Sequence, residues 1–472
     1  MKEFIKLFVL LKIMKKESKR DIELRHKARR HSIKEGMWAT VQSSLGSRYI
    51  SPFAIAINAS NSLVALFGSV SGLIGPLTQL FSSRLMEKYS RKKIILKAVL
   101  FEALMWLPFI IIGFLFFKGI LLDLLPLLLL FAFAIQLIAA NIAAPPWFSW
   151  IGDIVDDSYR GRWFAKRNLL LGFVSIVLAI ISSFFLDYFK NMNLVMFGFI
   201  ILFGLALFGR FMSWKCFKKQ YEPKLKLKKD DYFSFWDFLI KSPKTNFGKF
   251  AIFRFFLAFS TSVITPLIAV YLLRNLSFNY IIYMAITMAG SFFALTIIEL
   301  WGKFADKFGN YKTIVISCIF IPLIPILWIL NASPIYLILV PSIIGGIFWA
   351  GFHLSAGNFI YDNVGNVKRG IAVSYYNMLL GLGTFLGAGL GAILIKYINT
   401  TTIQPIIVIF IISAVLRLFT IIIGLPMMKE VRKVKKFKGT SSLKNLIIKE
   451  ARPTLVEEVH QIMSMKEYLR EK

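Results

Sequence analysis

The sequence contains few cysteine, histidine and acidic residues. Its 472 residues include 2 Cys, 4 His and 25 Asp and Glu. Two cysteines cannot build the disulfide framework of a small secreted protein. The histidines are scattered along the chain, with no ligand spacing typical of a metal site: His26, His31, His353 and His460. No G-x-x-x-x-G-K-[ST] pattern is present, which excludes a P-loop nucleotidase. We therefore predict a protein that is not an enzyme and that holds no cofactor or metal.

Charged residues are also scarce, and apolar residues dominate. Charged residues make up 17% of the chain and hydrophobic residues 57%, whereas soluble domains average about 25% charged. Apolar runs of about 20 residues recur, each long enough to cross a bilayer core of about 30 Å as a helix. The runs are continuous rather than alternating, which excludes a β-barrel. The predicted fold class is therefore an all-α, polytopic membrane protein with twelve transmembrane helices: 38–57, 62–82, 94–117, 121–151, 165–187, 192–214, 247–272, 278–301, 313–331, 334–361, 371–395 and 402–425.

The basic residues predict the orientation of these spans. Of the 57 Lys and Arg, 49 fall in alternate connecting segments: 1–37, 84–97, 160–167, 215–249, 303–312, 368–369 and 428–472. Basic loops stay in the cytoplasm, so we expect a multi-pass protein of the cell membrane with both termini cytoplasmic. The net charge of +32 then suits anionic lipid headgroups. No nucleic-acid-binding module accompanies it, and no nucleic-acid partner is expected.

The loop pattern also predicts the domain organisation. We expect the apolar stretch "FIKLFVLLKIMKK", which lysines interrupt, to lie on the membrane surface as an amphipathic helix. Within the linker, "YFSFWDFLI" predicts a short interfacial helix. The expected units are a basic N-terminal segment (1–37), a six-helix half (38–214), a cytoplasmic linker (215–246), a second six-helix half (247–426) and a cytoplasmic tail (427–472).

The two halves repeat one another in sequence. "SRLMEKYSRKK" (83–93) aligns with "GKFADKFGNYK" (302–312), and "GDIVDDSYRGRWFAKRNLLLG" (152–172) aligns with "YDNVGNVKRGIAVSYYNMLLG" (361–381). "YISPFAIAI" aligns with "VITPLIAVY", which places Pro52 over Pro266. Arg210 and Arg417, late in spans 6 and 12, also correspond. Parallel six-helix repeats joined by a loop are one of the architectures of secondary transporters.

"GKFADKFGNYK", between spans 8 and 9, resembles the signature loop of the major facilitator superfamily. The D-x6-R-G turns after spans 4 and 10 are similar to that family's turns as well. The resemblance covers residues 38–426. It implies alternating access of two halves around a central site, with a small-molecule substrate and, in many members, a coupling ion.

The resemblance also implies a conformational latch. In the family, the loop acid contacts a helix start in the other half in one conformation only, and nearby basic residues pair with acids. The alternative is that these residues merely orient the loops. The matching positions in this chain are Gly302, Asp306, Lys307, Gly309 and Lys312, their repeat counterparts Glu87, Lys88 and Arg91, and Asp153, Arg160, Asp362 and Arg369.

By the same resemblance, spans 1, 4, 7 and 10 surround the substrate path, and spans 3, 6, 9 and 12 lie outside. Polar residues follow helical spacing in span 1 and in span 7. The predicted cavity or coupling residues are Ser44, Arg48, Ser51, Asn58, Gln136, Asn141, Arg254, Thr261, Thr265, Trp349, His353 and Asn358.

Arg48 is the strongest of these candidates, because an arginine at mid-membrane costs about 2.5–3.5 kcal/mol. It serves the substrate or coupling site, forms a structural pair with Glu102, or snorkels to the cytoplasm. Arg254 lies near a span end, where snorkelling to the cytoplasm is favoured. Arg210 and Arg417 are expected to be interfacial anchors. His353 is either a proton-coupling group or a packed polar residue.

The sequence thus predicts a secondary active transporter or facilitator of a small solute. Cationic side chains without abundant cavity carboxylates favour an organic anion. Two alternatives stay open, a multidrug or metabolite efflux antiporter and a non-transporting membrane scaffold or sensor.

Overall fold

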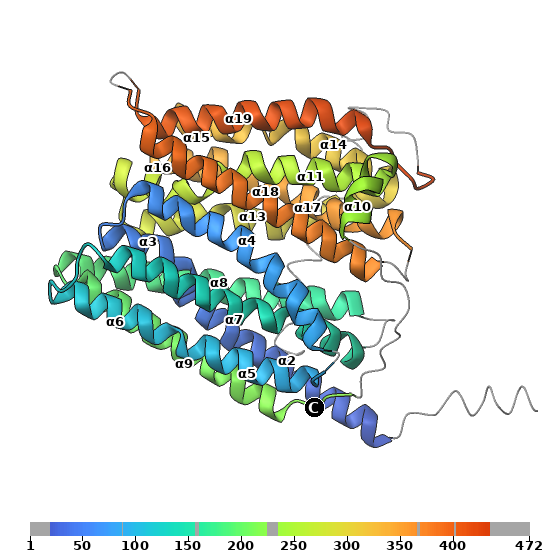
Figure 1. The fold of residues 1–472 in the computed structure, drawn as a ribbon, viewed down its shortest axis with the longest axis horizontal. Coiled ribbons are helices and arrows are strands. Elements are labelled where there is room, and N and C mark those ends of the chain that lie inside the picture. The colour runs from blue at the N-terminus through green and yellow to red at the C-terminus, as the bar shows by residue number, and fades with distance from the viewer. Residues whose placement is uncertain are drawn as a thin grey trace, which may run out of the picture.

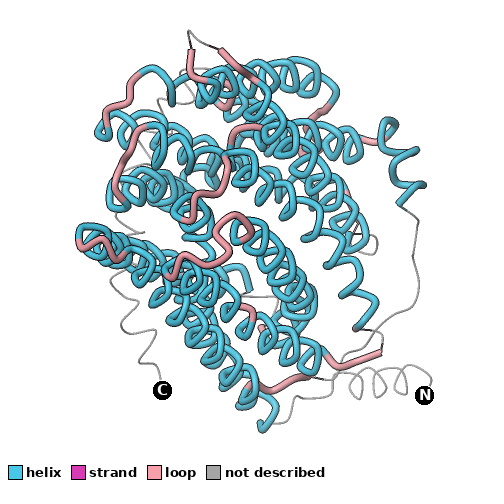
Figure 2. The backbone as a smooth tube through the Cα atoms, turned by 60° about the vertical axis from the view of Figure 1, so that its left-hand side comes forward, coloured by secondary structure: helices cyan, strands magenta, loops and turns pink. Residues whose placement is uncertain are grey.

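The computed structural model describes residues 19–86, 88–155, 160–223, 235–365, 369–400 and 403–434. The predicted surface helix at residues 1–18 and the tail beyond residue 434 lie outside these ranges. Among the described residues the secondary structure is helical, and Figure 2 draws no strand. Within the described ranges, eleven helices are long and apolar enough to cross a membrane. The all-helical, multi-pass architecture predicted from the sequence is confirmed.

The first half occupies the lower part of Figure 1, in blue to green. Two of its helices, α5 and α6, together form one span because only Met105 separates them. The elements are α2 (Lys19–Leu45), η1 (Ser47–Tyr49), α3 (Ile50–Ala56), α4 (Asn61–Leu85), α5 (Arg91–Leu104), α6 (Trp106–Phe117), α7 (Leu125–Ile154), α8 (Arg160–Asn191) and α9 (Val195–Lys219).

The second half lies above it in Figure 1, in yellow-green to red. The linker helix expected at "YFSFWDFLI" is present as α10. The elements are α10 (Phe235–Lys241), η2 (Ser242–Lys244), α11 (Asn246–Ser262), η3 (Thr265–Leu267), α12 (Ile268–Val270), η4 (Tyr271–Asn275), α13 (Tyr280–Phe308), α14 (Asn310–Phe320), α15 (Leu323–Leu330), α16 (Pro334–Leu337), η5 (Ile338–Ser342), α17 (Ile343–Asn363), α18 (Arg369–Tyr397), α19 (Pro405–Gly424) and η6 (Leu425–Met427).

The first helix of each half is broken at the same repeat position. The break after α2 precedes Pro52, and the break after α11 precedes Pro266. Proline lacks an N–H and its ring clashes with the preceding turn, so a continuous helix is disfavoured there. Span 1 is therefore built from the end of α2, η1 and α3. No candidate span covers 38–57, whereas the similarly broken segment Asn246–Asn275 is one, so the polar residues of span 1 rather than the break set it apart.

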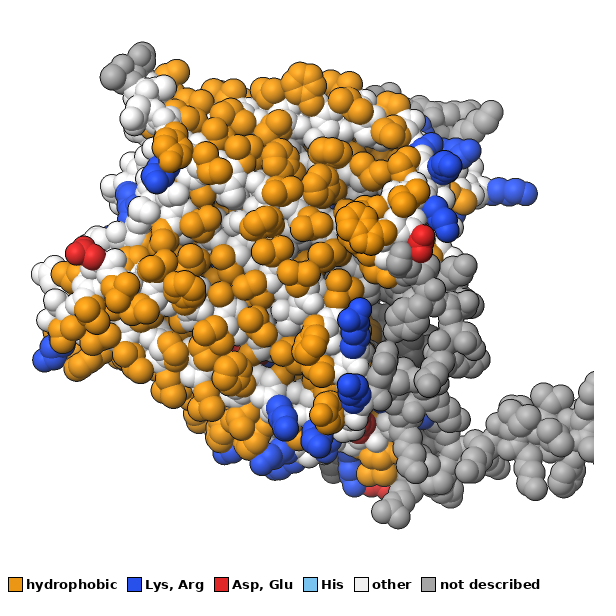
Figure 3. Space-filling model, in the orientation of Figure 1, with side chains coloured by type: hydrophobic (Ala, Val, Ile, Leu, Met, Phe, Trp, Pro, Cys, Tyr) orange, Lys and Arg blue, Asp and Glu red, His pale blue; other side chains and the backbone are white. Residues whose placement is uncertain are grey.

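The molecule has two chemically different ends. We call the end that carries residues 84–93, 215–223, 303–312 and 428–434 the basic end, and the end that carries 57–61, 118–124, 192–194, 275–279, 331–333 and 398–400 the opposite end. Figure 3 shows hydrophobic side chains over the middle of the visible face and Lys and Arg gathered toward the right, where the basic end lies. The band of exposed apolar side chains, such as Phe131, Phe184 and Phe419, fits contact with lipid chains rather than water.

The halves meet most closely along α4 and α18. A Cβ on Gly72 of α4 would lie 2.6 Å from the Phe385 backbone nitrogen of α18, and one on Gly381 of α18 would lie 2.2 Å from the Pro76 ring of α4. Glycine at these positions permits close packing of helices, as small residues commonly do in membrane proteins. The two helices thus form a tight seam beside the central cavity.

Candidate functional site: a cationic cavity

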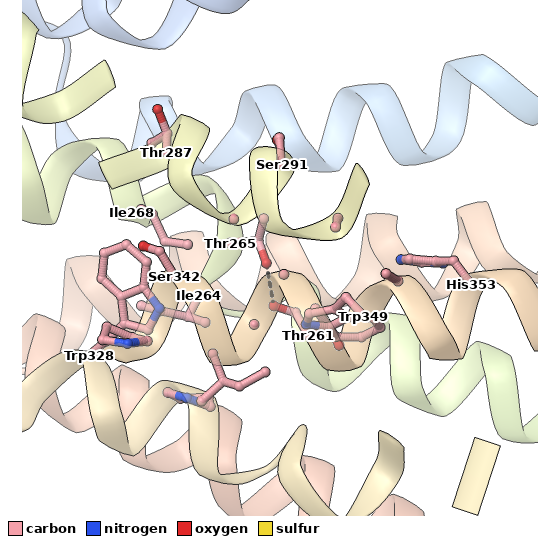
Figure 4. A pocket seen from close by; sticks show the side chains of 18 of the residues that line it. Thr261, Ile264, Thr265, Ile268, Thr287, Ser291, Trp328, Ser342, Trp349 and His353 are labelled. Atoms are coloured by element: carbon pink, nitrogen blue, oxygen red, sulfur yellow. Dashed lines mark hydrogen bonds between the residues drawn. The ribbon is translucent and has the colours of Figure 1, made fainter. Parts of the chain in front are cut away.

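A cavity of about 970 Å³ lies near the centre of the molecule, mainly within the second half. Figure 4 shows its wall formed by Thr261 of α11, Thr287 and Ser291 of α13, and Trp349 and His353 of α17. Trp328 and Ser342 lie farther along the same wall. The first half contributes four lining residues, which come from η1 and α8: Arg48, Gly172, Ser175 and Ile176.

The charge of the lining has one sign. Its ionisable residues are Arg48, Arg254, Arg417 and His353, and no Asp, Glu or Lys is among the described residues that line it. Most other lining side chains are aliphatic or aromatic. A cavity of this kind attracts an anion, because charge interactions strengthen where water and screening ions are excluded.

Arg48 lies in η1, at the break in span 1. Its guanidinium donates to Ser175 Oγ (3.0 Å) in the same half and to Met288 Sδ (3.0 Å) in the other half. Its Nε has no hydrogen-bond partner. The alternative pairing with Glu102 is wrong, because Glu102 binds Arg210 instead (2.5 Å). Arg48 is therefore half-buried, lines the cavity and bridges the two halves.

Arg254 is held inside the second half. It is 6% exposed, and its Nε donates to the Tyr376 hydroxyl (2.8 Å). The guanidinium carbon lies 4.7 Å from the centre of the Phe352 ring. The expectation that Arg254 snorkels to the membrane surface is therefore wrong. Aromatic faces stabilise the cation and hold it at the cavity wall.

Neither Arg210 nor Arg417 is an interfacial anchor. The Arg210 and Glu102 side chains are 11% and 5% exposed and form an ion pair inside the first half. Arg417 is 4% exposed and lines the cavity, although it belongs to the outermost helix of its half in the sequence-based assignment. The prediction failed because span position alone does not tell which way a helix presents one side chain.

The other predicted cavity residues in the lining are Thr261, Thr265, Trp349 and His353. The threonine hydroxyls donate to backbone carbonyls of Leu257 (2.6 Å) and Thr261 (2.9 Å). The Trp349 and His353 rings stack with centroids 5.2 Å apart. Figure 4 places His353 at one end of the labelled group and Trp328 at the other.

Six predicted residues lie outside the lining: Ser44, Ser51, Asn58, Gln136, Asn141 and Asn358. The prediction for span 1 treated its polar residues as one face of a continuous helix. The chain instead breaks at η1 and turns at Asn58 (φ 62°) at the opposite end. Ser44 shares a hydrogen bond with Ser175 (3.0 Å), directly behind the cavity wall. The Asn141 side chain of α7 accepts a hydrogen bond from the Gln79 side chain of α4 (3.0 Å) and so joins these two helices.

The predicted latch residues lie at the basic end. Asp306 is 80% exposed and is 3.9 Å from Arg432, which follows the second half in the chain. Lys88 and Lys312 are exposed, and Lys307 lies over the Phe308 ring. Gly302 packs loosely, with Leu354 as the nearest neighbour of a hypothetical Cβ (3.9 Å). Glu87 and the side chains of Arg160 and Arg369 lie outside the described part of the chain.

The turn residues make equivalent contacts at corresponding repeat positions in the two halves. Arg91, which starts α5, pairs with Asp153 at 2.6 Å. Its repeat counterpart Asn310, which starts α14, donates to Asp362 at 2.7 Å. Gly309 has φ 100°, a conformation that favours glycine. Each acid thus ties its own half together at the basic end.

Contacts that the sequence did not predict join the halves at the opposite end. Asp187 of α8 accepts hydrogen bonds from the backbone N–H groups of Tyr280 (2.9 Å) and Ile281 (2.8 Å), at the start of α13. Arg274 donates to the Asn61 side chain and to the Ala59 carbonyl (2.8 Å). A carboxylate at a helix N-terminus satisfies free N–H groups and complements the helix dipole. The only sequence signal was the presence of these two charges at span ends.

The chain was compared with known proteins. A family model described as Major Facilitator Superfamily matches residues 37–247 and 250–464. No curated protein matches the sequence. A solved mutant of the nucleoside transporter NupG aligns with a TM-score of 0.66 at 14% identity, over 86% of this chain and 100% of that chain. A bacterial homologue of the iron transporter ferroportin, in an inward-facing state, aligns with a TM-score of 0.64 at 14% identity, over 87% of this chain and 99% of that chain.

A third similar structure is a bacterial homologue of the human lysosomal transporter Spinster, also inward-facing. It aligns with a TM-score of 0.59 at 13% identity, over 88% of this chain and 100% of that chain. At such identities the likeness shows the fold alone. Within the ranges that the structure describes, no group of three or more His, Cys, Asp and Glu residues could hold a metal ion.

Proposed function

The chain belongs to the major facilitator superfamily, and from this premise we propose that it carries a small organic anion across the cell membrane by alternating access. In this proposal the two halves rock about the central cavity as a secondary active transporter or facilitator. The observation that carries the proposal is the lining itself, with three arginines and no carboxylate among its described residues. Buried cations without acidic partners call for an anionic ligand.

The volume and surface of the cavity support a small, partly apolar substrate. A cavity of about 970 Å³ falls within the roughly 300–1,000 Å³ range of small-molecule sites.

Arg48 contacts both halves and would sense their relative movement, because its Ser175 and Met288 contacts lie on opposite sides of the interface. We assign Arg48 and Arg254 to substrate binding, and His353 to the same wall as the group that protonation could couple to transport.

The contacts between halves support a conformation closed at the opposite end. With the basic end in the cytoplasm, as the loop charges favour, this conformation is inward-facing. The Asp187 and Arg274 contacts would then close the external side. Asp306, which is exposed here, would engage the first half only when the basic end closes. The latch role of the loop follows from this proposal.

The test is a thermal-shift screen of the detergent-purified protein, followed by uptake into proteoliposomes. The panel pairs organic anions with their uncharged amides and with lipophilic cations. A ligand at 100 times its Kd stabilises the folded state by about 2.7 kcal/mol. We expect anions alone to stabilise the protein and to be transported, and Arg48→Ala to weaken their binding about tenfold or more.

Lys303→Ala is the matched control, because Lys303 is a cation of the basic end outside the cavity lining. It should bind and transport like the unmodified protein. Stabilisation by cations or neutral solutes alone, or an equal anion response in the Arg48→Ala variant, would contradict the proposal.

A further inference from the structure

Arg210 and Arg417 occupy corresponding places in the two halves but have different electrostatic partners. Arg210 of α9 binds the Glu102 carboxylate through Nε (2.9 Å) and through Nη2 (2.5 Å). Among the described residues, Arg417 of α19 donates only to backbone carbonyls, those of Ile321 (3.3 Å) and Thr261 (3.5 Å), and its Nε has no hydrogen-bond partner. Within that part of the chain, one arginine of the pair is neutralised and the other is not.

The repeat identifies what the second half lacks. The alignment that places Arg91 over Asn310, the first residues of α5 and α14, places Glu102 over Ile321 when continued without a gap. The structure agrees, because Arg417 contacts the backbone of Ile321 itself. The carboxylate that neutralises Arg210 is thus replaced by an aliphatic side chain in the second half.

The other buried arginines of the first half also have acidic partners. Arg167 lies 3.4 Å from Glu35, and Arg91 lies 2.6 Å from Asp153. By contrast, no ion pair of Arg417 occurs among the described residues. A buried guanidinium without a counter-charge is strongly unfavourable. Retaining such a group at a cavity wall indicates that an external anion supplies the missing charge.

The surroundings of Arg417 fit one kind of anion. Phe410 and Trp328, which line the same cavity, stack with ring centroids 6.4 Å apart and an interplanar angle of 18°. Ile324 and Pro325 extend this apolar wall. A carboxylate on an apolar body would place its charge on the guanidinium and its body against these rings.

We propose that Arg417 binds the carboxylate of the transported anion, in the position that the Glu102 carboxylate holds on Arg210 in the first half. The inference rests on the proposed function and deepens it, since it names the substrate class as carboxylates with an apolar body. Arg417 then acts as a binding residue contributed by a helix that sequence reasoning assigned to the periphery.

The first experiment needs no transport and compares Ile321→Glu with the unmodified protein. The new carboxylate should neutralise Arg417, as Glu102 neutralises Arg210, and raise the melting temperature in carboxylate-free buffer. The matched control is Ile321→Gln, whose side chain is similar in shape to that of Ile321→Glu but uncharged. This variant should not raise the melting temperature. A melting temperature that falls equally for both variants would contradict the inference.

The second experiment titrates benzoate, benzamide and potassium chloride against the detergent-purified protein in a low-salt zwitterionic buffer. Benzoate should raise the melting temperature and benzamide should not, because only benzoate carries the charge. Arg417→Met removes the buried charge, and we expect it to weaken apparent benzoate affinity about tenfold or more. Ile321→Glu should abolish the benzoate response, because its own carboxylate occupies the guanidinium.

The outcomes separate this inference from the proposed function. If organic anions bind and are transported but Arg417→Met and Ile321→Glu respond like the unmodified protein, the Arg417 assignment fails and the transporter proposal stands. If chloride alone gives the Arg417-dependent shift, the site binds an inorganic anion and the carboxylate assignment is overturned. If no anion of the earlier screen stabilises the unmodified protein, the proposed function itself fails.

Discussion

At the level of single residues, the arginines that line the cavity differ from buried arginines elsewhere in the described chain. Outside the lining, buried arginines approach a carboxylate within 3.4 Å: Arg91, Arg167 and Arg210. In the lining, Arg48, Arg254 and Arg417 donate to hydroxyl groups, a thioether or backbone carbonyls instead. The difference marks where the molecule can accept an external anion.

The internal pair of the first half should be essential for stability. Glu102→Gln leaves the Arg210 guanidinium buried without its counter-charge, and breaking a buried pair in this way costs about 3–5 kcal/mol. We expect the free energy of unfolding in detergent to fall by that amount. The control is Glu299→Gln, which removes a partly exposed i,i+4 pair with Lys303. This variant should change the free energy of unfolding by about 0.5 kcal/mol or less. Equal losses in both variants would show that burial of the pair has no special role.

At the level of elements, α18 packs backbone to backbone against α11 through its glycines. Hypothetical Cβ atoms on Gly383, Gly387 and Gly391 would lie 2.1–2.3 Å from carbonyl oxygens of α11 and of Val263, the residue that follows it. Small residues at every fourth position let transmembrane helices approach closely.

A single methyl group should therefore disturb this interface. Gly387→Ala forces the Phe259 carbonyl away from a position 2.1 Å from the new Cβ, and we expect a loss of about 1–3 kcal/mol in unfolding free energy. Gly357→Ala is the matched control, because nothing lies within 4 Å of its hypothetical Cβ in α17. It should be neutral or stabilising by up to about 1 kcal/mol. Thermal unfolding of both variants in the same detergent gives the comparison, and an unchanged Gly387→Ala midpoint would argue against tight packing.

At the level of the whole molecule, the two halves are held together at the opposite end by a small number of polar contacts. Asp187 binds the first N–H groups of α13 at that end. Farther along the seam between the halves, Ser69 of α4 donates to the Phe385 carbonyl of α18 (2.9 Å). Ser69 is 3% exposed at this interface. These contacts must break if the opposite end opens, so they bias the equilibrium between conformations.

Removing the Asp187 carboxylate should favour opening at that end. A charge-assisted hydrogen bond contributes about 1.5–3 kcal/mol, so Asp187→Ala should increase the open population about tenfold or more. The measurement is the labelling rate of Ser69→Cys by a membrane-impermeant maleimide, in a background where Cys216 and Cys318 are replaced. Asp123→Ala, which removes an exposed acid from the same end, should label no faster than the parent. Unchanged labelling in Asp187→Ala would show that the contact does not limit opening.

The sequence alone determined the membrane class, the approximate spans, the twofold repeat and the family resemblance. These properties depend on local hydropathy, charge and residue order, which need no knowledge of distant contacts. Arg48, Arg254, Thr261, Thr265, Trp349 and His353 line one cavity, and their role at a substrate site stays a prediction. Other candidates lie outside this lining, such as Asn58, where the chain turns after the break in span 1.

Only the tertiary structure decided which charges are paired. Glu102 could have met Arg48 or Arg210, and the choice depends on helix rotation that spacing within one span does not encode. Helix rotation also decides the position of Arg417, which was expected at the membrane surface from the sequence and lines the cavity in the structure. Likewise, Asp187 of α8 bonds to Tyr280 at the start of α13, and these two residues are 93 positions apart in the sequence. Electrostatic partners are set by distances across helices, and those distances exist only once the helices have packed.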